Sequence, residues 1–265
     1  MIGGHGGNVY ELARRLGCAP AEILDLSSNV NPLGPPAGLR AHLVRQIEAV
    51  NALPEVDSRG ITQGYARHLG IAADRLIAGH GTTQFIYSLP AALHVKKALI
   101  VGPTYSDYAD ACRMQGVAFE FFLCRESDGF TPDLDRLATA AAGADTVFIC
   151  TPNNPTGAIV PGDALKALCL RRPQVRFVVD ESYLPFVVDG EGQSLARSGI
   201  ENLVVLLSIS KIYRIPGLRV GFLVAVPAII DAFAAGMWPW SVNSLGQAAV
   251  RFLCEAGPEP VKSTR

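Results

Sequence analysis

The sequence predicts an α/β protein in which a mainly parallel sheet is covered by helices on both faces, a three-layer α/β/α architecture. Short apolar runs rich in β-branched residues alternate with helical stretches through the middle of the chain, as they do in β-α-β units. These runs are continuously apolar rather than alternating, which is typical of strands buried on both faces. We expect strands at residues 98–101, 146–150, 176–179, 203–207 and 220–224.

The expected helices follow from apolar residues spaced three and four apart. The first covers residues 9–16, with Leu12 and Leu16 on one face, and ends at Gly17, because glycine favours helix ends. The prolines and glycines of residues 27–36 exclude a helix there, so this stretch is an ordered loop. The other expected helices are 39–50, 63–69, 83–93, 107–115, 134–142, 163–170 and 245–254.

The composition excludes several classes of protein. The 265 residues include 23 Lys and Arg against 24 Asp and Glu, so no basic excess supports nucleic-acid binding. A hydrophobic content of 49% is too high for a disordered chain. No run reaches the ~18 apolar residues of a membrane span, and the first residues lack a signal-peptide pattern, so we expect a cytoplasmic protein. The six cysteines and five histidines show no metal-ligand spacing, so free thiols and no metal site are expected.

Polar residues follow the predicted strands where each strand ends. Tyr105 comes after the first strand, Asn154 after the second, Asp180 and Tyr183 after the third, and Lys211 after the fourth. Ligands of such sheets bind outside the carboxyl ends of the strands. Each residue alone has an ordinary explanation, such as a helix cap or an ion pair, but together they indicate one ligand site.

A second pattern indicates an anion. The glycine-containing segment 79–83 precedes a predicted helix, where free backbone N–H groups could hold a phosphate, although alone it also fits a helix start with a threonine cap. Arg219 and the serines beside Lys211 add donors. A lysine in such surroundings predicts a phosphate-bearing carbonyl cofactor with Lys211 as the Schiff-base amine.

These motifs resemble those of the fold-type I pyridoxal-phosphate enzymes, in the class I and II aminotransferase group. The resemblance rests on the segment 154–157 (Asn-Pro-Thr-Gly), Asp180-x-x-Tyr183, and Ser208-x-Ser210-Lys211 with Arg219 eight residues later. It implies that pyridoxal 5′-phosphate is the cofactor and that the sheet is the large domain of this fold.

The resemblance also implies a role for each residue. Lys211 would join the cofactor covalently, Asp180 would pair with the ring nitrogen, and Tyr105 would stack on the ring. Tyr183 and Asn154 would hydrogen-bond the ring hydroxyl. The residues expected to hold the phosphate are Gly81, Thr82, Thr83, Ser208, Ser210 and Arg219.

A narrower resemblance concerns the substrate. Segments 5–8, 28–34, 216–219 and 239–243 are similar to those of the threonine-phosphate decarboxylases of cobalamin biosynthesis. This similarity implies a small phosphorylated amino acid as substrate, and loss of CO₂ from L-threonine O-3-phosphate to give 1-amino-2-propanol phosphate. The alternatives are an aminotransferase of the histidinol-phosphate type and a cofactor-binding remnant without catalysis. The residues expected near the substrate are His5, Gly6, Asn29 and Asn243.

The resemblance further implies a domain division and an oligomer. Residues 1–37 would form an N-terminal arm and substrate loop, 38–243 the cofactor-binding large domain, and 244–265 the truncated start of a small domain that is largely missing. The chain would then be naturally short, the product of a broken coding sequence, or a fragment. Leu53 stands where relatives carry a tyrosine that reaches the cofactor phosphate of the neighbouring subunit, which implies a homodimer and a lower cofactor affinity.

Overall fold

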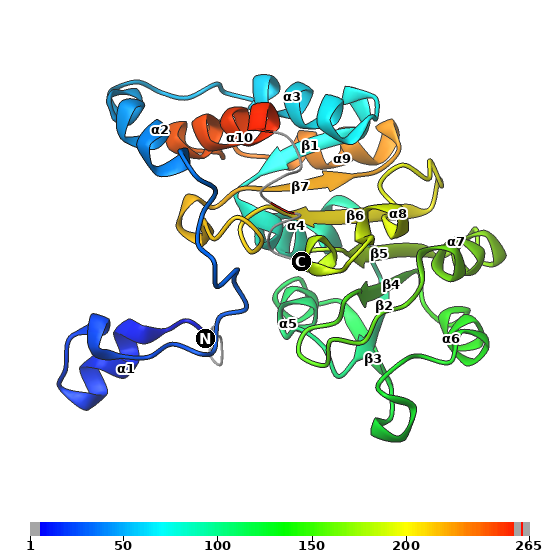
Figure 1. The fold of residues 1–265 in the computed structure, drawn as a ribbon. Helices are drawn as coiled ribbons and strands as arrows, with labels where there is room; N and C mark the ends of the chain where they lie inside the picture. Colours follow the sequence, from blue (N-terminus) through cyan, green and yellow to red (C-terminus); the bar gives the residue numbers. More distant parts are fainter. Residues whose placement is uncertain (1–5, 257–260, 262–265) are drawn as a thin grey trace.

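A seven-stranded mixed sheet forms the centre of the computed structural model, which describes residues 6–256 and 261 (Figure 1). The strand order is β1-β7-β6-β5-β4-β2-β3, and only β7 runs antiparallel to its neighbours. The three-layer α/β/α prediction is therefore confirmed, with one reversed strand. The strands are β1 (Leu76–Gly79), β2 (Lys97–Gly102), β3 (Ala118–Leu123), β4 (Thr146–Cys150), β5 (Arg176–Asp180), β6 (Leu203–Ser208) and β7 (Gly221–Val224).

Helices lie on both faces of this sheet. One face is covered by α3 (Arg59–Leu69), α6 (Leu134–Ala141), α7 (Gly162–Arg171) and α10 (Ser244–Ala256), and the other by α4 (Gly81–Ala92), α5 (Asp107–Met114) and α9 (Pro227–Gly236). The remaining helices are α1 (Val9–Leu16), α2 (Leu39–Arg45) and the short α8 (Gly190–Gln193).

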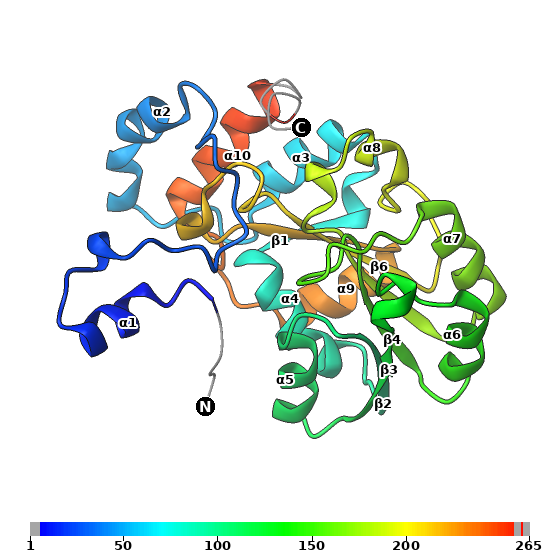
Figure 2. The same cartoon turned by 60° about the horizontal axis from the view of Figure 1, so that its bottom comes forward.

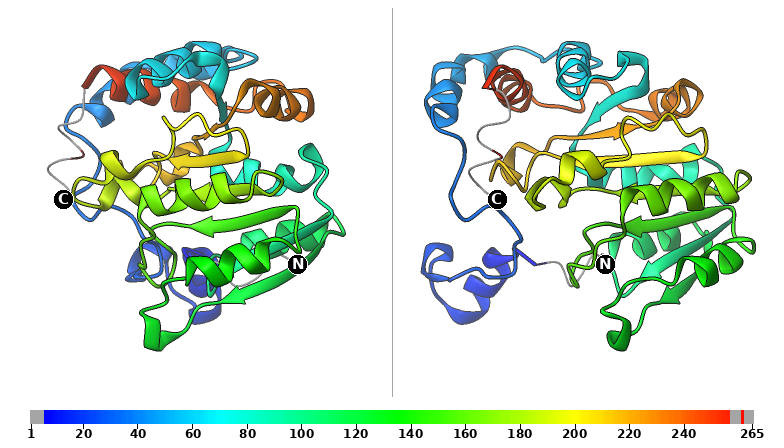
Figure 3. Two further views of the ribbon diagram at one scale, coloured as in Figure 1. Left: turned by 90° about the vertical axis from the view of Figure 1, so that its right-hand side faces the viewer. Right: turned by 45° about the vertical axis from the view of Figure 1, so that its right-hand side comes forward.

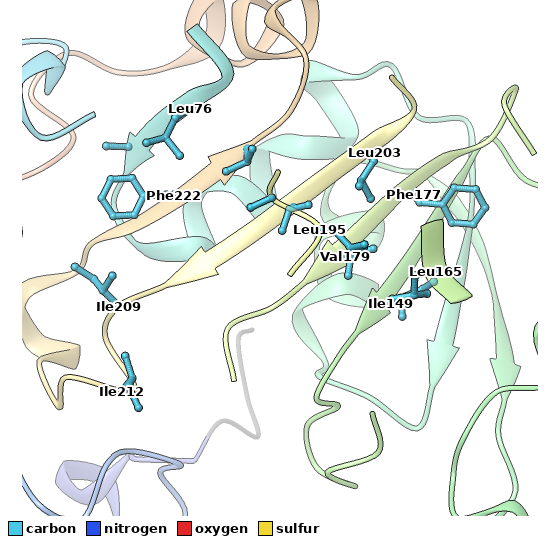
Figure 4. Close-up of a cluster of buried hydrophobic side chains, with 14 of the residues drawn as sticks. Leu76, Ile149, Leu165, Phe177, Val179, Leu195, Leu203, Ile209, Ile212 and Phe222 are labelled. Carbon is cyan, nitrogen blue, oxygen red and sulfur yellow. The ribbon is translucent and has the colours of Figure 1, made fainter. Parts of the chain in front are cut away.

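The core is split in two by the sheet because side chains alternate along a strand. Along β5, Phe177 and Val179 enter the cluster beneath α3 and α7, whereas Val178 enters the cluster beneath α4 and α5. Figure 4 shows the first cluster, in which Phe177 and Val179 of β5 and Leu165 of α7 are labelled. This alternation decides which face receives each polar side chain at the end of the strand.

Four of the named elements were not predicted from the sequence pattern. They are the strands β1 and β3, the helix α9 and the short helix α8. β3 is an edge strand that pairs only with β2, and its Phe121 and Leu123 are exposed, so it lacks the continuous burial of the predicted strands.

Two helix boundaries also differ from expectation. The predicted helix 39–50 is wrong in its second half: α2 ends at Arg45, and a 3₁₀ segment, Ile47–Asn51, follows, a common way for a helix to end. α3 begins at Arg59, earlier than the expected residue 63, because Glu55 accepts a hydrogen bond from the Gly60 N–H (2.6 Å) and so caps a glycine-containing first turn.

The N-terminal arm stands apart from the sheet, as Figure 1 and Figure 2 show for α1. The segment after α1 is attached to the body through Asn31, which is 3% exposed. Its side chain donates to the carbonyl of Ile212 (2.8 Å), and its backbone N–H donates to the carbonyl of Lys211 (3.0 Å). The arm is thus tied to the loop that carries the predicted reactive lysine.

At the other end of the described chain, α10 packs beside α2 and α3 (Figure 3). The rings of His42 and Phe252 lie 5.1 Å apart between their centroids at this contact. Over the described residues, none of the helices combines the length and the apolar character that crossing a bilayer requires.

Candidate active site

A polar cavity of about 390 Å³ opens where β4, β5 and β6 end and α4 begins. All eleven predicted cofactor-binding residues line it, and so do Gly6 and Asn29 of the arm. His5 lies outside the described residues. The eleven are Gly81, Thr82, Thr83, Tyr105, Asn154, Asp180, Tyr183, Ser208, Ser210, Lys211 and Arg219.

Asn243, which was expected near the substrate, does not line this cavity. Its side-chain nitrogen donates to the carbonyl of Leu218 (2.8 Å), and its side-chain oxygen accepts from the Gly246 N–H (2.8 Å) at the start of α10. The carboxamide of Asn243 therefore connects the loop that contains Leu218 to the start of α10. The residue caps this helix and is not part of the cavity wall.

Asp180 ends β5 and is 5% exposed. Its Oδ2 accepts a hydrogen bond from the Tyr108 hydroxyl (2.8 Å), and its Oδ1 accepts from the Ser182 N–H (2.9 Å). Burial raises the pKa of Asp180, while these bonds and the charge of Lys211 act in the opposite direction. Each carboxylate oxygen has two lone pairs, so Asp180 can accept a further N–H from a ligand.

Lys211 lies in the loop that follows β6. Burial lowers the pKa of its amine, and the nearby positive charge of Arg219 lowers it further, while Asp180 opposes the change. A lysine with a lowered pKa offers more of the uncharged, nucleophilic amine near neutral pH. The backbone bond from Asn31 holds this loop in place.

An anion cradle lies at the N-terminus of α4. A Cβ added to Gly81 would lie 2.7 Å from Nη2 of Arg219, and Gly81 has φ +71°, so only glycine leaves the space between the backbone and the guanidinium open. Nη2 of Arg219 lies 3.5 Å from Oγ1 of Thr83. Free N–H groups, hydroxyls and one guanidinium thus converge as they do at phosphate sites.

Two phenols, Tyr105 and Tyr183, also line the cavity. Burial raises the pKa values of Tyr105 and Tyr183, so both remain neutral donors at physiological pH. A hydrogen bond with the Asn29 side chain partly offsets this effect at Tyr183. Asn29 therefore links the arm to a cavity residue.

The sequence reasoning missed several residues of the lining, among them Tyr108, Cys150 and Ser182. Tyr108 follows Tyr105 by three residues, one helical turn, and the two rings meet edge to face with centroids 5.9 Å apart. The spacing of three residues between the two tyrosines, at the start of a predicted helix, could have indicated from the sequence that Tyr108 lies on the same side as Tyr105.

The donor set fits pyridoxal 5′-phosphate. The cradle beside Gly81 suits a dianionic phosphate, buried Asp180 suits a protonated ring nitrogen, and Lys211 suits a carbonyl carbon. Tyr105 supplies an aromatic face. These groups complement the phosphate, the ring nitrogen, the carbonyl carbon and the ring face of this cofactor.

Comparisons with known proteins agree with this geometry. The family model described as aminotransferase class I and II matches residues 21–259. The threonine-phosphate decarboxylase of Salmonella typhimurium is 34% identical over 248 residues, covering 92% of this chain and 68% of that protein. The histidinol-phosphate aminotransferase of Moorella thermoacetica is 34% identical over 249 residues, covering 91% of this chain and 63% of that protein.

A solved structure gives the same result. The L-threonine-O-3-phosphate decarboxylase from Porphyromonas gingivalis superposes with a TM-score of 0.77 at 29% identity, covering 86% of this chain and 71% of that one. The resemblance read from the motifs is confirmed. The chain belongs to the aminotransferase class I and II family and is an enzyme of the pyridoxal 5′-phosphate-dependent type.

Proposed function

We propose that this enzyme releases CO₂ from L-threonine O-3-phosphate and forms 1-amino-2-propanol phosphate in cobalamin biosynthesis. The observation that carries the proposal is the meeting of two arm segments at the cavity. The Gly7 N–H donates to Oγ of Ser27 (2.7 Å), and Gly6, Ser27, Ser28 and Asn29 all line the wall. These segments are part of the decarboxylase-like pattern, and this chain covers 68% of the Salmonella decarboxylase against 63% of the Moorella aminotransferase.

Different residues of the cavity would have different roles in the proposed reaction. Pyridoxal phosphate, when bound, supplies a ring that accepts the electron pair of a bond broken at the substrate α-carbon. Lys211 would hold the cofactor carbonyl, and Asp180 would keep a proton at the ring nitrogen. Arg219 and the N-terminus of α4 would bind its phosphate.

Orientation by the protein would then select the bond that breaks. A decarboxylase would have to present the substrate's bond to the carboxylate for cleavage, and an aminotransferase the bond to hydrogen, so residues that hold the anionic ends of the substrate would decide between the two reactions. Asn29 sits at the junction of arm and cavity and contacts Tyr183. It is therefore placed to orient an anionic end of the substrate.

A histidinol-phosphate-type aminotransferase is the second candidate. The Moorella enzyme reaches the same 34% identity, and the cofactor-binding residues serve both reactions. The difference lies in which substrate bond is presented, not in the cofactor site. A cofactor-binding protein without turnover is the third outcome.

One experiment separates these functions. The protein loaded with cofactor is incubated with L-threonine O-3-phosphate, and separately with histidinol phosphate and 2-oxoglutarate, while CO₂ release and amino transfer are measured independently. The proposal expects CO₂ from the first substrate without 2-oxoglutarate. Amino transfer without CO₂ would assign the aminotransferase, and bound cofactor without either product would assign the non-catalytic protein.

We also propose that the protein is a homodimer. Exposed apolar side chains gather in two segments, 44–56 with Leu53 (74% exposed) and 238–240 with Trp238 (81% exposed), which we treat as one apolar patch. A hydrogen bond from the Trp240 N–H to the carbonyl of Val56 (2.8 Å) joins the two segments. Large apolar patches of this kind mark association surfaces. Its members are Val44, Ile47, Val50, Leu53, Val56, Trp238 and Trp240.

Sedimentation at several protein concentrations tests the dimer. The wild type is expected to sediment as a dimer, and Trp238→Glu as a monomer with unchanged circular dichroism. Leu170→Glu, an exposed apolar residue of α7 outside the patch, is the matched control and should remain dimeric. A monomeric wild type would overturn this proposal.

A further inference from the structure

Tyr108 is a buried phenol for which the proposed reaction has no use. It lies in the first turn of α5 and is 1% exposed. Its ring stacks on Phe148, with centroids 5.4 Å apart and planes inclined by 22°, and meets Tyr105 edge to face. Packing on both sides therefore fixes the direction of its hydroxyl, which donates to Oδ2 of Asp180 at 2.8 Å.

Asp180 depends on such donors to remain charged. Burial favours its neutral acid, and it lies in a wall with Cys150, Tyr105 and Tyr183, none of which carries positive charge. Three groups favour the carboxylate: Ser182, Tyr108 and the amine of Lys211. Glu181 points to the opposite face of the sheet and adds negative charge nearby.

Of these three groups, Tyr108 is the one whose hydroxyl comes from a different layer of the fold. Ser182 belongs to the same turn as Asp180, and Lys211 is committed to the cofactor carbonyl in the proposed reaction. Burial and the Asp180 charge raise the pKa of Tyr108 well above its ordinary value, so its hydroxyl keeps its proton. A permanent donor of this kind bonds a carboxylate more strongly than it bonds an acid.

We propose that Tyr108 is a positioning residue that holds the Asp180 carboxylate ionised and aimed at the ring nitrogen of the cofactor. The proposal rests on the cofactor site alone and is independent of whether the enzyme releases CO₂ or transfers an amino group. It assigns to α5 a part in cofactor binding through a residue that touches Asp180.

The test is the pH dependence of cofactor affinity in three proteins: wild type, Tyr108→Phe and Tyr65→Phe. Tyr108→Phe keeps the ring and removes the hydroxyl. Tyr65→Phe is the matched control, because its ring also stacks on a phenylalanine, Phe222 at 4.0 Å, on the other face of the sheet. The affinity of the apo protein for pyridoxal phosphate is measured by absorbance from acidic to mildly alkaline pH, with no substrate present.

The affinity of Tyr108→Phe for pyridoxal phosphate is expected to differ from that of the wild type by an amount that depends on pH. In Tyr108→Phe the acidic midpoint, below which affinity falls, should rise by about one pH unit, the effect of losing one hydrogen bond to a charged group. The affinity should fall about tenfold on the acidic side and approach the wild-type value at alkaline pH, where Asp180 is ionised in both proteins. The cofactor phosphate and Lys211 titrate in all three proteins, so the difference between them isolates Asp180.

A purely structural role for Tyr108 would weaken binding equally at every pH, and that result, or an unchanged midpoint, would overturn the proposal. A ring-fluorinated tyrosine at position 108 provides a second test that keeps the ring and the hydroxyl. Fluorination makes the phenol a stronger donor, so the acidic midpoint should move down, opposite to Tyr108→Phe. An unchanged midpoint in this protein would also overturn the proposal, whatever the fate of the phenylalanine variant.

Discussion

Two cavities lie on opposite sides of the β6 end, and Ser208 lines both. The front cavity is the candidate active site. The rear cavity, of about 290 Å³, lies between α3 and the loop around α8. Consecutive residues at the end of β5 supply one buried carboxylate to each, Asp180 to the front and Glu181 to the rear, because side chains alternate across the sheet.

The two carboxylates differ in what surrounds them. Glu181 accepts from Oγ of Ser194 (2.6 Å) and from the Leu195 N–H (2.7 Å), one bond at each oxygen, as Asp180 does from Tyr108 and Ser182. Asp180 shares its cavity with Lys211 and Arg219. The rear cavity is also lined by a cation, Arg197. A buried carboxylate with a cation nearby therefore does not identify a cofactor site by itself; the amine of Lys211 and the open N-terminus of α4 beside Asp180 do.

The largest loss of turnover is expected from removing the Lys211 amine of the front cavity. Lys211→Ala should lower turnover by about 10⁴-fold or more, because no other amine replaces a lost nucleophile. The absorbance of covalently bound cofactor should disappear as well. Lys166→Ala, which removes a partly exposed lysine paired with Asp163 on α7, is the control, and turnover by Lys211→Ala close to the wild-type value would contradict the assignment.

The second-largest loss of turnover is expected at Asp180, the carboxylate of the front cavity. Asp180→Asn should lower turnover by about 10²- to 10³-fold, because a neutral amide stabilises a protonated ring nitrogen poorly. The protein should still fold, since an amide can occupy the same space. Steady-state kinetics measure the loss, and activity within a few-fold of the wild type would remove Asp180 from the mechanism.

A smaller effect is expected at the phosphate end. Arg219→Met should weaken pyridoxal phosphate binding by about 10- to 100-fold, the value of one charge-assisted hydrogen bond to an anion. Equilibrium dialysis of the cofactor against the apo protein measures the change. Arg171→Met, which removes a surface ion pair with Asp135, should leave affinity unchanged; equal losses in both variants would show that net charge, not the cradle, holds the phosphate.

The smallest effect on activity is expected at the rear carboxylate, where stability should change instead. Burial raises the pKa of Glu181 from 4.5 to about 7. Because the folded protein binds this proton more tightly than the unfolded chain does, the stabilisation is complete below pH 4.5 and is lost as the pH rises through about 7. The difference corresponds to about 3 kcal/mol of unfolding free energy.

Glu181→Gln should remove that pH dependence. Glutamine can still accept from the Leu195 N–H and can donate to the Ser194 hydroxyl, so the variant should lose less stability than the wild type between about pH 5 and about pH 8. Urea denaturation at the two pH values measures this, with Glu126→Gln on the surface as the control. A variant with the same pH dependence as the wild type, or with turnover as low as that of Asp180→Asn, would break the contrast between the two cavities.

The polar residues of the front cavity were predictable from the sequence because they follow strand ends. Parallel strands bring their carboxyl ends to one edge, so Tyr105, Asn154, Asp180 and Lys211 meet once the strands are recognised. Continuous apolar runs identified β2, β4, β5 and β6, since burial on both faces leaves a local signal. The edge strand β3 has no fully buried residue on either face and left no such signal.

The pairing of Tyr108 with Asp180 depends on packing. The two residues are 72 positions apart, and their hydrogen bond exists because α5, which packs on β2 and β3, brings its first turn to the end of β5. The same holds for Asn243, whose sequence context resembles a substrate segment but whose carboxamide is engaged by Leu218 and Gly246. Strand burial is a property of neighbouring residues and can be predicted from them, whereas a side chain's hydrogen-bond partners depend on the distant elements that packing places beside it.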